Sequence, residues 1–239
     1  MSEVVYPPVI AACKVMFRAL DLKIRIEGAE NVPRAGGAVL ASNHIGYLDF
    51  IFAGLGAQPA GRLVRFMAKH EVFKHPISGP LMRNMKHISV DREAGVQSFR
   101  DALTALKSGE MIGIFPEATI STSFTVKEFK SGATRMAMSA GVPLIPVAVW
   151  GTHRMWTKGR PRTLTRRHTP ITILIGEPLE VNRKDDVNVA TAELRRRITA
   201  LVDRAQREYP DKPKDDADRW WLPAHLGGTA PQPTVAPAS

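Results

Sequence analysis

Cysteine is almost absent from this sequence, which has only Cys13 among its 239 residues. A single thiol cannot form a disulfide within one chain, so a reducing compartment is expected. Residues 1–8 contain no Lys or Arg before the apolar stretch that follows, and therefore lack the charged start of a secretory signal peptide. Both absences favour a protein that works inside the cell.

Long hydrophobic runs are missing as well. The longest stretch without Asp, Glu, Lys, Arg or His covers 136–152, and it is interrupted by Gly141, Pro143, Pro146 and Gly151. Such a stretch is too short and contains too many helix breakers to span a bilayer as one helix. The sequence therefore predicts no transmembrane segment, and any contact with a membrane should be peripheral.

The motifs of several common protein classes are also lacking. There is no G-x-S-x-G hydrolase elbow and no P-loop, and the stretch Gly54-x-Gly56-x-x-Pro59 fails the dinucleotide fingerprint at its last position. His70 and His75 are five steps apart, one more than the zinc-protease motif requires, so a helix would not present both on one face. Aromatic residues are only 7% and no zinc or helix-turn-helix spacing occurs, which argues against a nucleic-acid-binding module.

Positive charge, in contrast, is abundant. The chain has 33 Lys and Arg against 23 Asp and Glu, a net charge of +10. A basic surface favours nucleic acid, anionic lipid or a phosphate-bearing substrate as partner. Five cations gather in the segment 158–167, which either attracts anionic groups or is simply a solvated loop: Lys158, Arg160, Arg162, Arg166 and Arg167.

Strand and helix patterns alternate along the chain. Strands are predicted over 23–27, 38–42, 64–68, 87–90, 111–115, 144–150 and 171–175, and helices over 7–22, 48–55, 77–83, 96–107, 129–139 and 187–208. This alternation is typical of an α/β fold: a single domain with a mixed, largely parallel sheet flanked by helices. The domain should span 23–209. The tail, 210–239, is rich in Pro, Asp and Gly and should be disordered from Gly227, although Trp220 and Trp221 should dock on the domain or on lipid.

The segment before this domain, 1–22, predicts an amphipathic helix. Apolar residues recur at helical spacing on one face, and Lys14 and Arg18 lie four apart on another. Such a helix either caps the core as a surface element or docks in the headgroup region of a membrane with its cations reaching outward.

The most informative segment follows the strand predicted over 38–42. It reads Asn43-His44-Ile45-Gly46-Tyr47-Leu48-Asp49 and leads into a helix. Catalytic groups favour such strand-to-helix turns, because the sheet holds the turn rigidly and the loop exposes it. His44 can act as a general base, with Asp49 bonded to the other ring nitrogen to fix the tautomer. No protein nucleophile is evident, as expected if the hydroxyl of an acceptor substrate attacks directly.

Three further segments strengthen this interpretation. The strand over 111–115 leads into Phe-Pro-Glu-Ala-Thr-Ile-Ser at 115–121, the segment 87–92 ends in Arg92, and 142–147 reads Val-Pro-Leu-Ile-Pro-Val. Together with the His44 segment and in this order, they resemble the glycerolipid acyltransferase family, typified by bacterial 1-acylglycerol-3-phosphate (lysophosphatidic acid) acyltransferases. The resemblance covers about 40–149.

The resemblance implies roles for particular residues. His44 is expected to be the general base and Asp49 its orienting partner, both catalytic. Gly46 is expected to let the loop approach the substrate, with backbone N–H groups of the same loop holding the tetrahedral oxyanion. Glu117 and Thr119 are expected to organise the acceptor pocket.

Phosphate binding is expected from Arg92 and Lys130, the latter in a Phe-Lys-x-Gly-Ala segment at 129–133 that is also similar to the family. Two positions depart from the family pattern: Ala118 replaces a glycine, and Ile120 replaces an arginine that would meet the phosphate of the acceptor. Either Arg92, Lys127, Lys130 or Arg135 must then supply this charge, or the acceptor differs from lysophosphatidic acid.

The expected reaction is transfer of a fatty acyl group from acyl-CoA or acyl carrier protein to lysophosphatidic acid, giving phosphatidic acid for phospholipid biosynthesis. No metal and no bound cofactor is expected. The alternatives are an acyltransferase acting on another lysophospholipid or a glycolipid, and a non-catalytic lipid-binding protein. The expected location is peripheral, at an anionic surface on the cytoplasmic face of the cell membrane, without nucleic acid as a partner.

Overall fold

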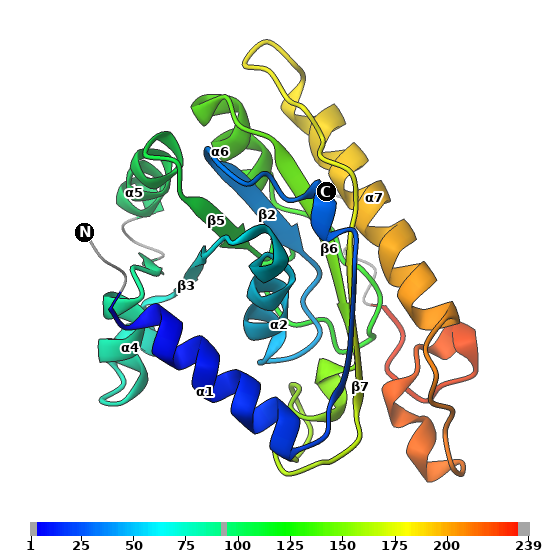
Figure 1. Cartoon of the computed structure of the whole chain (residues 1–239). Coiled ribbons are helices and arrows are strands. Elements are labelled where there is room, and N and C mark those ends of the chain that lie inside the picture. The colour runs from blue at the N-terminus through cyan, green and yellow to red at the C-terminus, as the bar shows by residue number, and fades with distance from the viewer. Residues whose placement is uncertain (1–3, 92–94, 234–239) are drawn as a thin grey trace.

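One seven-stranded sheet forms the centre of the computed structural model, which describes residues 4–91 and 95–233 (Figure 1). Its strands are β1 (Lys23–Glu27), β2 (Ala38–Ser42), β3 (Val64–Lys69), β4 (Ile88–Val90), β5 (Met111–Ile114), β6 (Leu144–Trp150) and β7 (Pro170–Ile175). Their order in space is β1-β7-β6-β2-β5-β3-β4, and every pairing is parallel except β6 with β7. The predicted α/β class with a mixed, largely parallel sheet is confirmed.

Helices cover both faces of this sheet. Within the described residues they are α1 (Tyr6–Ala19), α2 (Asp49–Gly56), α3 (His70–Lys74), α4 (Ser78–Asn84), α5 (Gly95–Lys107), α6 (Gly132–Ala140) and α7 (Val187–Arg207). Helices α5, α6 and α7 contribute to one hydrophobic core and α1 and α2 to the other, and β2 alternates between the two, with Val39 in one and Leu40 in the other. Strand β2 is therefore buried on both sides, which explains why it reads as a continuous apolar run.

The predicted elements agree with the observed ones to within a few residues at their ends. Helix α3 was not predicted, because its five residues are too few to show a helical period. No helix among the described residues is both long and apolar enough to cross a membrane.

The C-terminal segment is more ordered than its composition suggests. Gly227, Gly228 and Thr229 each donate a backbone hydrogen bond to the segment between Arg219 and Ala224, so the disorder expected from Gly227 is not found there. Trp221 is completely buried. Its indole ring lies under the Arg154 guanidinium at 4.4 Å, and its carbonyl accepts a bond from His153 Nε2 at 2.9 Å. The segment therefore packs behind the loop that follows β6.

Candidate active site

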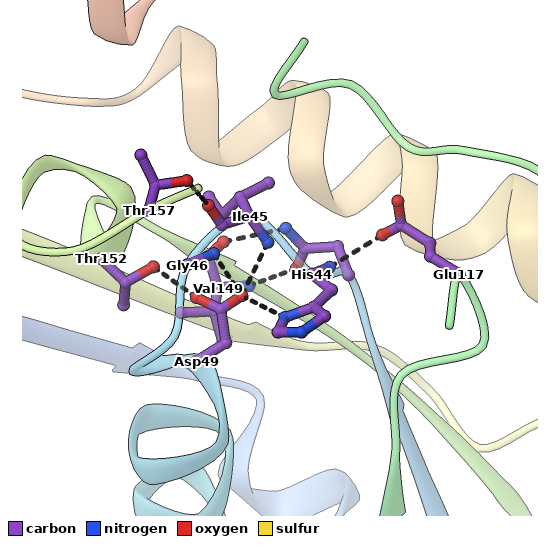
Figure 2. Close-up of polar contacts among 9 residues, drawn as sticks. His44, Ile45, Gly46, Asp49, Glu117, Val149, Thr152 and Thr157 are labelled. Carbon is purple, nitrogen blue, oxygen red and sulfur yellow. Dashed lines mark hydrogen bonds and ion pairs between the residues drawn. The ribbon is translucent and has the colours of Figure 1, made fainter. Parts of the chain in front are cut away.

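The carboxyl ends of three neighbouring strands bring the polar residues together. Strands β5, β2 and β6 are adjacent and parallel, so the loops that follow them emerge at the same edge of the sheet. His44 follows β2, Glu117 follows β5 and Thr152 follows β6. Figure 2 shows these side chains around the loop at His44. Residues more than 100 positions apart thus form one cluster.

His44 and Asp49 are in direct contact. His44 Nδ1 lies 3.0 Å from Asp49 Oδ2, and because a carboxylate can only accept, the ring donates from Nδ1. This fixes the neutral tautomer with the lone pair on Nε2, the nitrogen for which the described residues offer no hydrogen-bond partner. The ring also stacks on Phe115 at 4.2 Å between centroids. The imidazole is thus held on one face and one edge, with 20% of its side chain open to solvent.

Asp49 also organises the loop itself. Its Oδ2 atom accepts the N–H groups of Ile45 at 2.7 Å and Gly46 at 2.8 Å, while Oδ1 accepts the Thr152 hydroxyl. The side chain has no exposed surface. A buried charge of this kind is tolerated only when its lone pairs are satisfied, which four donors achieve here. The carboxylate therefore holds both the ring and the backbone that carries it.

The backbone N–H groups of this loop, which were expected to hold the oxyanion, face protein acceptors in this structure. The four N–H groups from 44 to 47 all have protein acceptors: His44 donates to Glu117, Ile45 and Gly46 to Asp49, and Tyr47 to the Trp156 carbonyl at 3.0 Å. None is left for a substrate oxygen.

The structure shows a packing constraint at Gly46. A Cβ atom at Gly46 would lie 2.9 Å from the Trp156 carbonyl oxygen and 3.2 Å from the His153 nitrogen. Glycine is required here because the β6–β7 loop packs against it.

That β6–β7 loop holds the His44 loop in place. Besides the bond from Thr152 to Asp49, the Thr157 hydroxyl donates to the Ile45 carbonyl at 2.6 Å. Asn43 adds two bonds to Val149, one in each direction, at 3.0 and 2.8 Å. Sequence reasoning missed Asn43, Thr152 and Thr157. Thr152 comes two residues after β6, and only the order of the sheet places that strand beside β2.

Glu117 joins two loops, and its carboxylate is 5% exposed. Its Oε1 atom accepts the His44 N–H at 2.8 Å, and Oε2 accepts the Lys127 N–H at 3.1 Å. Burial raises the pKa of this carboxyl to about 7, because the loss of hydration outweighs the two N–H bonds, which lower it. Glu117 thus supports the backbone of the histidine.

Replacing Glu117 by glutamine should flatten the pH dependence of stability. From the usual pKa of 4.5 up to about 7, the folded chain keeps a proton on Glu117 that the unfolded chain has lost. The free energy of unfolding should therefore fall by about 3 kcal/mol as the pH rises through this interval, and glutamine removes that dependence. Urea unfolding of both proteins at pH 5 and pH 8 measures this change in the free energy of unfolding. If the change were equal in the two proteins, another group would be responsible for it.

Ala118, which stands in place of the family's glycine, has a left-handed backbone with φ of 59°. This conformation costs a residue with a Cβ about 1–2 kcal/mol, which explains why a glycine suits the position. We expect Ala118→Gly to raise the free energy of unfolding by about 0.5–1 kcal/mol, after the greater flexibility of the unfolded glycine chain is subtracted. Ala12→Gly in the exposed part of α1 is the control, and it should destabilise by about 1 kcal/mol. Urea unfolding compares the two; a loss of stability at both positions would contradict the argument.

The remaining predicted residues lie at different distances from this cluster. The Thr119 hydroxyl accepts a bond from Lys127 Nζ at 2.6 Å, and Lys130 is exposed with its backbone N–H on the Pro116 carbonyl. Arg92 lies outside the described residues. His70 bonds to Ser89 and shares no ligand geometry with another histidine; the described chain holds no group of three or more potential metal ligands.

Comparison with known proteins gives consistent matches. A family model described as "Acyltransferase" matches residues 23–150. The chain is 30% identical over 193 residues to the 1-acyl-sn-glycerol-3-phosphate acyltransferase of Bacillus subtilis (strain 168), covering 79% of this chain and 89% of that one. It is 31% identical over 185 residues to the chloroplastic enzyme LPAT1 of Arabidopsis thaliana, 76% of this chain but only 49% of that one. The crystal structure of the LPA acyltransferase PlsC from Thermotoga maritima has a TM-score of 0.69 and 25% identity, covering 83% of this chain and 79% of that one.

Proposed function

From the premise that this chain belongs to the acyltransferase family, we propose that it acylates the free hydroxyl of 1-acylglycerol 3-phosphate and so makes phosphatidic acid for phospholipids. The names of its relatives support this acceptor. A thioester, acyl-CoA or acyl carrier protein, is the proposed donor, because a thiolate leaves readily once its carbonyl is attacked.

The observation that carries this proposal is the orientation of His44. Its Nδ1 atom is committed to Asp49, and Nε2 is the basic nitrogen at an edge of the ring that solvent can reach. A base in this tautomer can take a proton from an alcohol, and the buried carboxylate stabilises the imidazolium that results. The arrangement suits a hydroxyl acceptor and needs no nucleophile from the protein.

The proposed reaction proceeds through one proton transfer and one substitution. His44 Nε2 removes the proton of the acceptor hydroxyl as its oxygen attacks the thioester carbon. The tetrahedral intermediate collapses, the carbon–sulfur bond breaks, and the thiolate takes the proton from the imidazolium. An ester and a free thiol are the products, and we propose that no metal or bound cofactor takes part.

We further propose that the protein works peripherally at the cytoplasmic face of the cell membrane, with α1 as a docking element. Tyr6 and Phe17 anchor α1 to the core, while Val15 and Met16 remain exposed beside Lys14. Figure 1 shows the helix at the outside of the molecule. Exposed apolar side chains next to cations suit an anionic lipid surface, to which the net charge of +10 also adds attraction.

An assay with several acceptors tests the proposed reaction. Purified protein with liposomes receives radiolabelled palmitoyl-CoA, or palmitoyl carrier protein, and one of a panel of lysophospholipids, and thiol release and lipid product are followed together. Phosphatidic acid formed only in the presence of lysophosphatidic acid supports the proposal. Because Ile120 cannot bind phosphate, a second candidate is transfer to another lysophospholipid or a glycolipid, which the same panel reveals. Absence of thiol release with every pair would favour a lipid-binding protein.

A further inference from the structure

The turn that follows β5 has no charged side chain of its own beyond Glu117. Its position 120 is an isoleucine, which offers no hydrogen bond to an anion. A cation from further along the chain lies beside this turn instead: Lys127 Nζ donates to the Thr119 hydroxyl at 2.6 Å. An ammonium is thus held on Thr119, the residue that precedes position 120.

The backbone of Lys127 is fixed on both sides. Its N–H is bonded to one oxygen of the Glu117 carboxylate, whose other oxygen holds the N–H of His44. Its carbonyl accepts a bond from Arg195 Nε of α7 at 2.9 Å. A single carboxylate therefore separates the backbone of this lysine from that of the catalytic histidine, and the lysine cannot shift without disturbing both.

The charge of Lys127 is not neutralised by the protein. In the described part of the chain no carboxylate forms an ion pair with its ammonium, and the adjacent Glu128 is paired with Arg195 at 3.0 Å. An ammonium has three donors, and Thr119 uses one of them. Arg135, the next cation in α6, donates to Ser131 and is exposed. Lys127 is therefore a half-buried, positioned cation with donors to spare at the edge of the site.

We propose that Lys127 binds the phosphate of the acceptor and supplies the charge that position 120 lacks. The inference rests on the proposed function, since only a phosphate-bearing acceptor requires such a cation. A charge-assisted bond from an ammonium to a phosphate oxygen is strong and directional enough to select phosphorylated acceptors over neutral ones.

The test compares Lys127→Met with Lys127→Arg, each with lysophosphatidic acid and with monoacylglycerol, which has no phosphate. Lys127→Met should raise KM for lysophosphatidic acid about 10- to 100-fold with little change in kcat, and leave monoacylglycerol acylation unchanged. Lys127→Arg should keep most of the affinity, and adding Ile120→Arg to the methionine variant should restore it. Lys107→Met, at the opposite edge of the sheet, is the matched control and should change nothing.

A binding experiment separates this inference from the proposed function. Binding of lysophosphatidic acid to liposome-bound protein is measured for the His44→Ala variant and for the same variant with Lys127→Met added. This measurement needs no turnover. If Lys127→Met weakens the binding of lysophosphatidic acid but not of monoacylglycerol, the role of Lys127 is supported, even if the wild type transfers no acyl group. Absence of acyl transfer by the wild type would refute only the proposed reaction. Unchanged binding and unchanged KM would overturn the inference. Thermal unfolding of each variant checks that the fold is intact.

Discussion

Replacing His44 by alanine is expected to lower kcat for acyl transfer by about 10²- to 10⁴-fold, while KM for both substrates changes little. The alanine protein retains the loop, because the N–H of residue 44 still bonds to Glu117 and the two following N–H groups still bond to Asp49. What it loses is the base that takes the hydroxyl proton, and general base catalysis contributes an effect of this size. Steady-state kinetics with saturating acyl-CoA and lysophosphatidic acid measure it.

A matched control uses a histidine from outside the site. His225 is exposed in the C-terminal segment, so His225→Ala should have the activity of the wild type. If His44→Ala kept more than about a tenth of the wild-type kcat, proton removal by this ring would not limit the reaction, and another base would have to be sought.

Replacing Asp49 by asparagine should cost about as much, roughly 10³- to 10⁴-fold in kcat. The carboxylate Oδ2 atom accepts bonds from the His44 ring and from two backbone N–H groups, and Oδ1 accepts the Thr152 hydroxyl. An amide oxygen can still face the loop, with its NH₂ group toward Thr152, so the fold is retained. The negative charge that stabilises the imidazolium is lost.

Thr152→Val separates the charge of Asp49 from its placement. Valine has the shape of threonine but cannot donate to Asp49 Oδ1, so the carboxylate keeps its charge and loses one of its four donors. We expect kcat to fall by about 10- to 100-fold, less than for Asp49→Asn, because one hydrogen bond to a charged group contributes about 1.5–3 kcal/mol. An equal loss in the two variants would mean that placement, rather than charge, is what Asp49 supplies.

The sequence alone determined the fold class and the central pair of residues. The alternation of strands and helices can be predicted without knowledge of the tertiary packing, because hydrophobic periodicity depends on local backbone geometry. The pairing of His44 with Asp49 could be predicted for the same reason. The two residues are five positions apart, at a strand exit and a helix start, so local structure brings them together. The likeness of 115–121 to a family motif pointed to Glu117.

Only the tertiary structure decided what surrounds that pair. Thr152 comes from a segment far along the chain, and its contact with Asp49 depends on the order of the strands, which periodicity does not encode. Lys127 is only eight residues from Thr119, and their contact depends on how the loop after β5 folds. The same holds for Gly46: whether a backbone N–H faces a substrate or a carboxylate depends on how a folded loop closes. Hydrogen bonds between distant loops depend on three-dimensional packing, which the spacing of residues in the sequence does not predict.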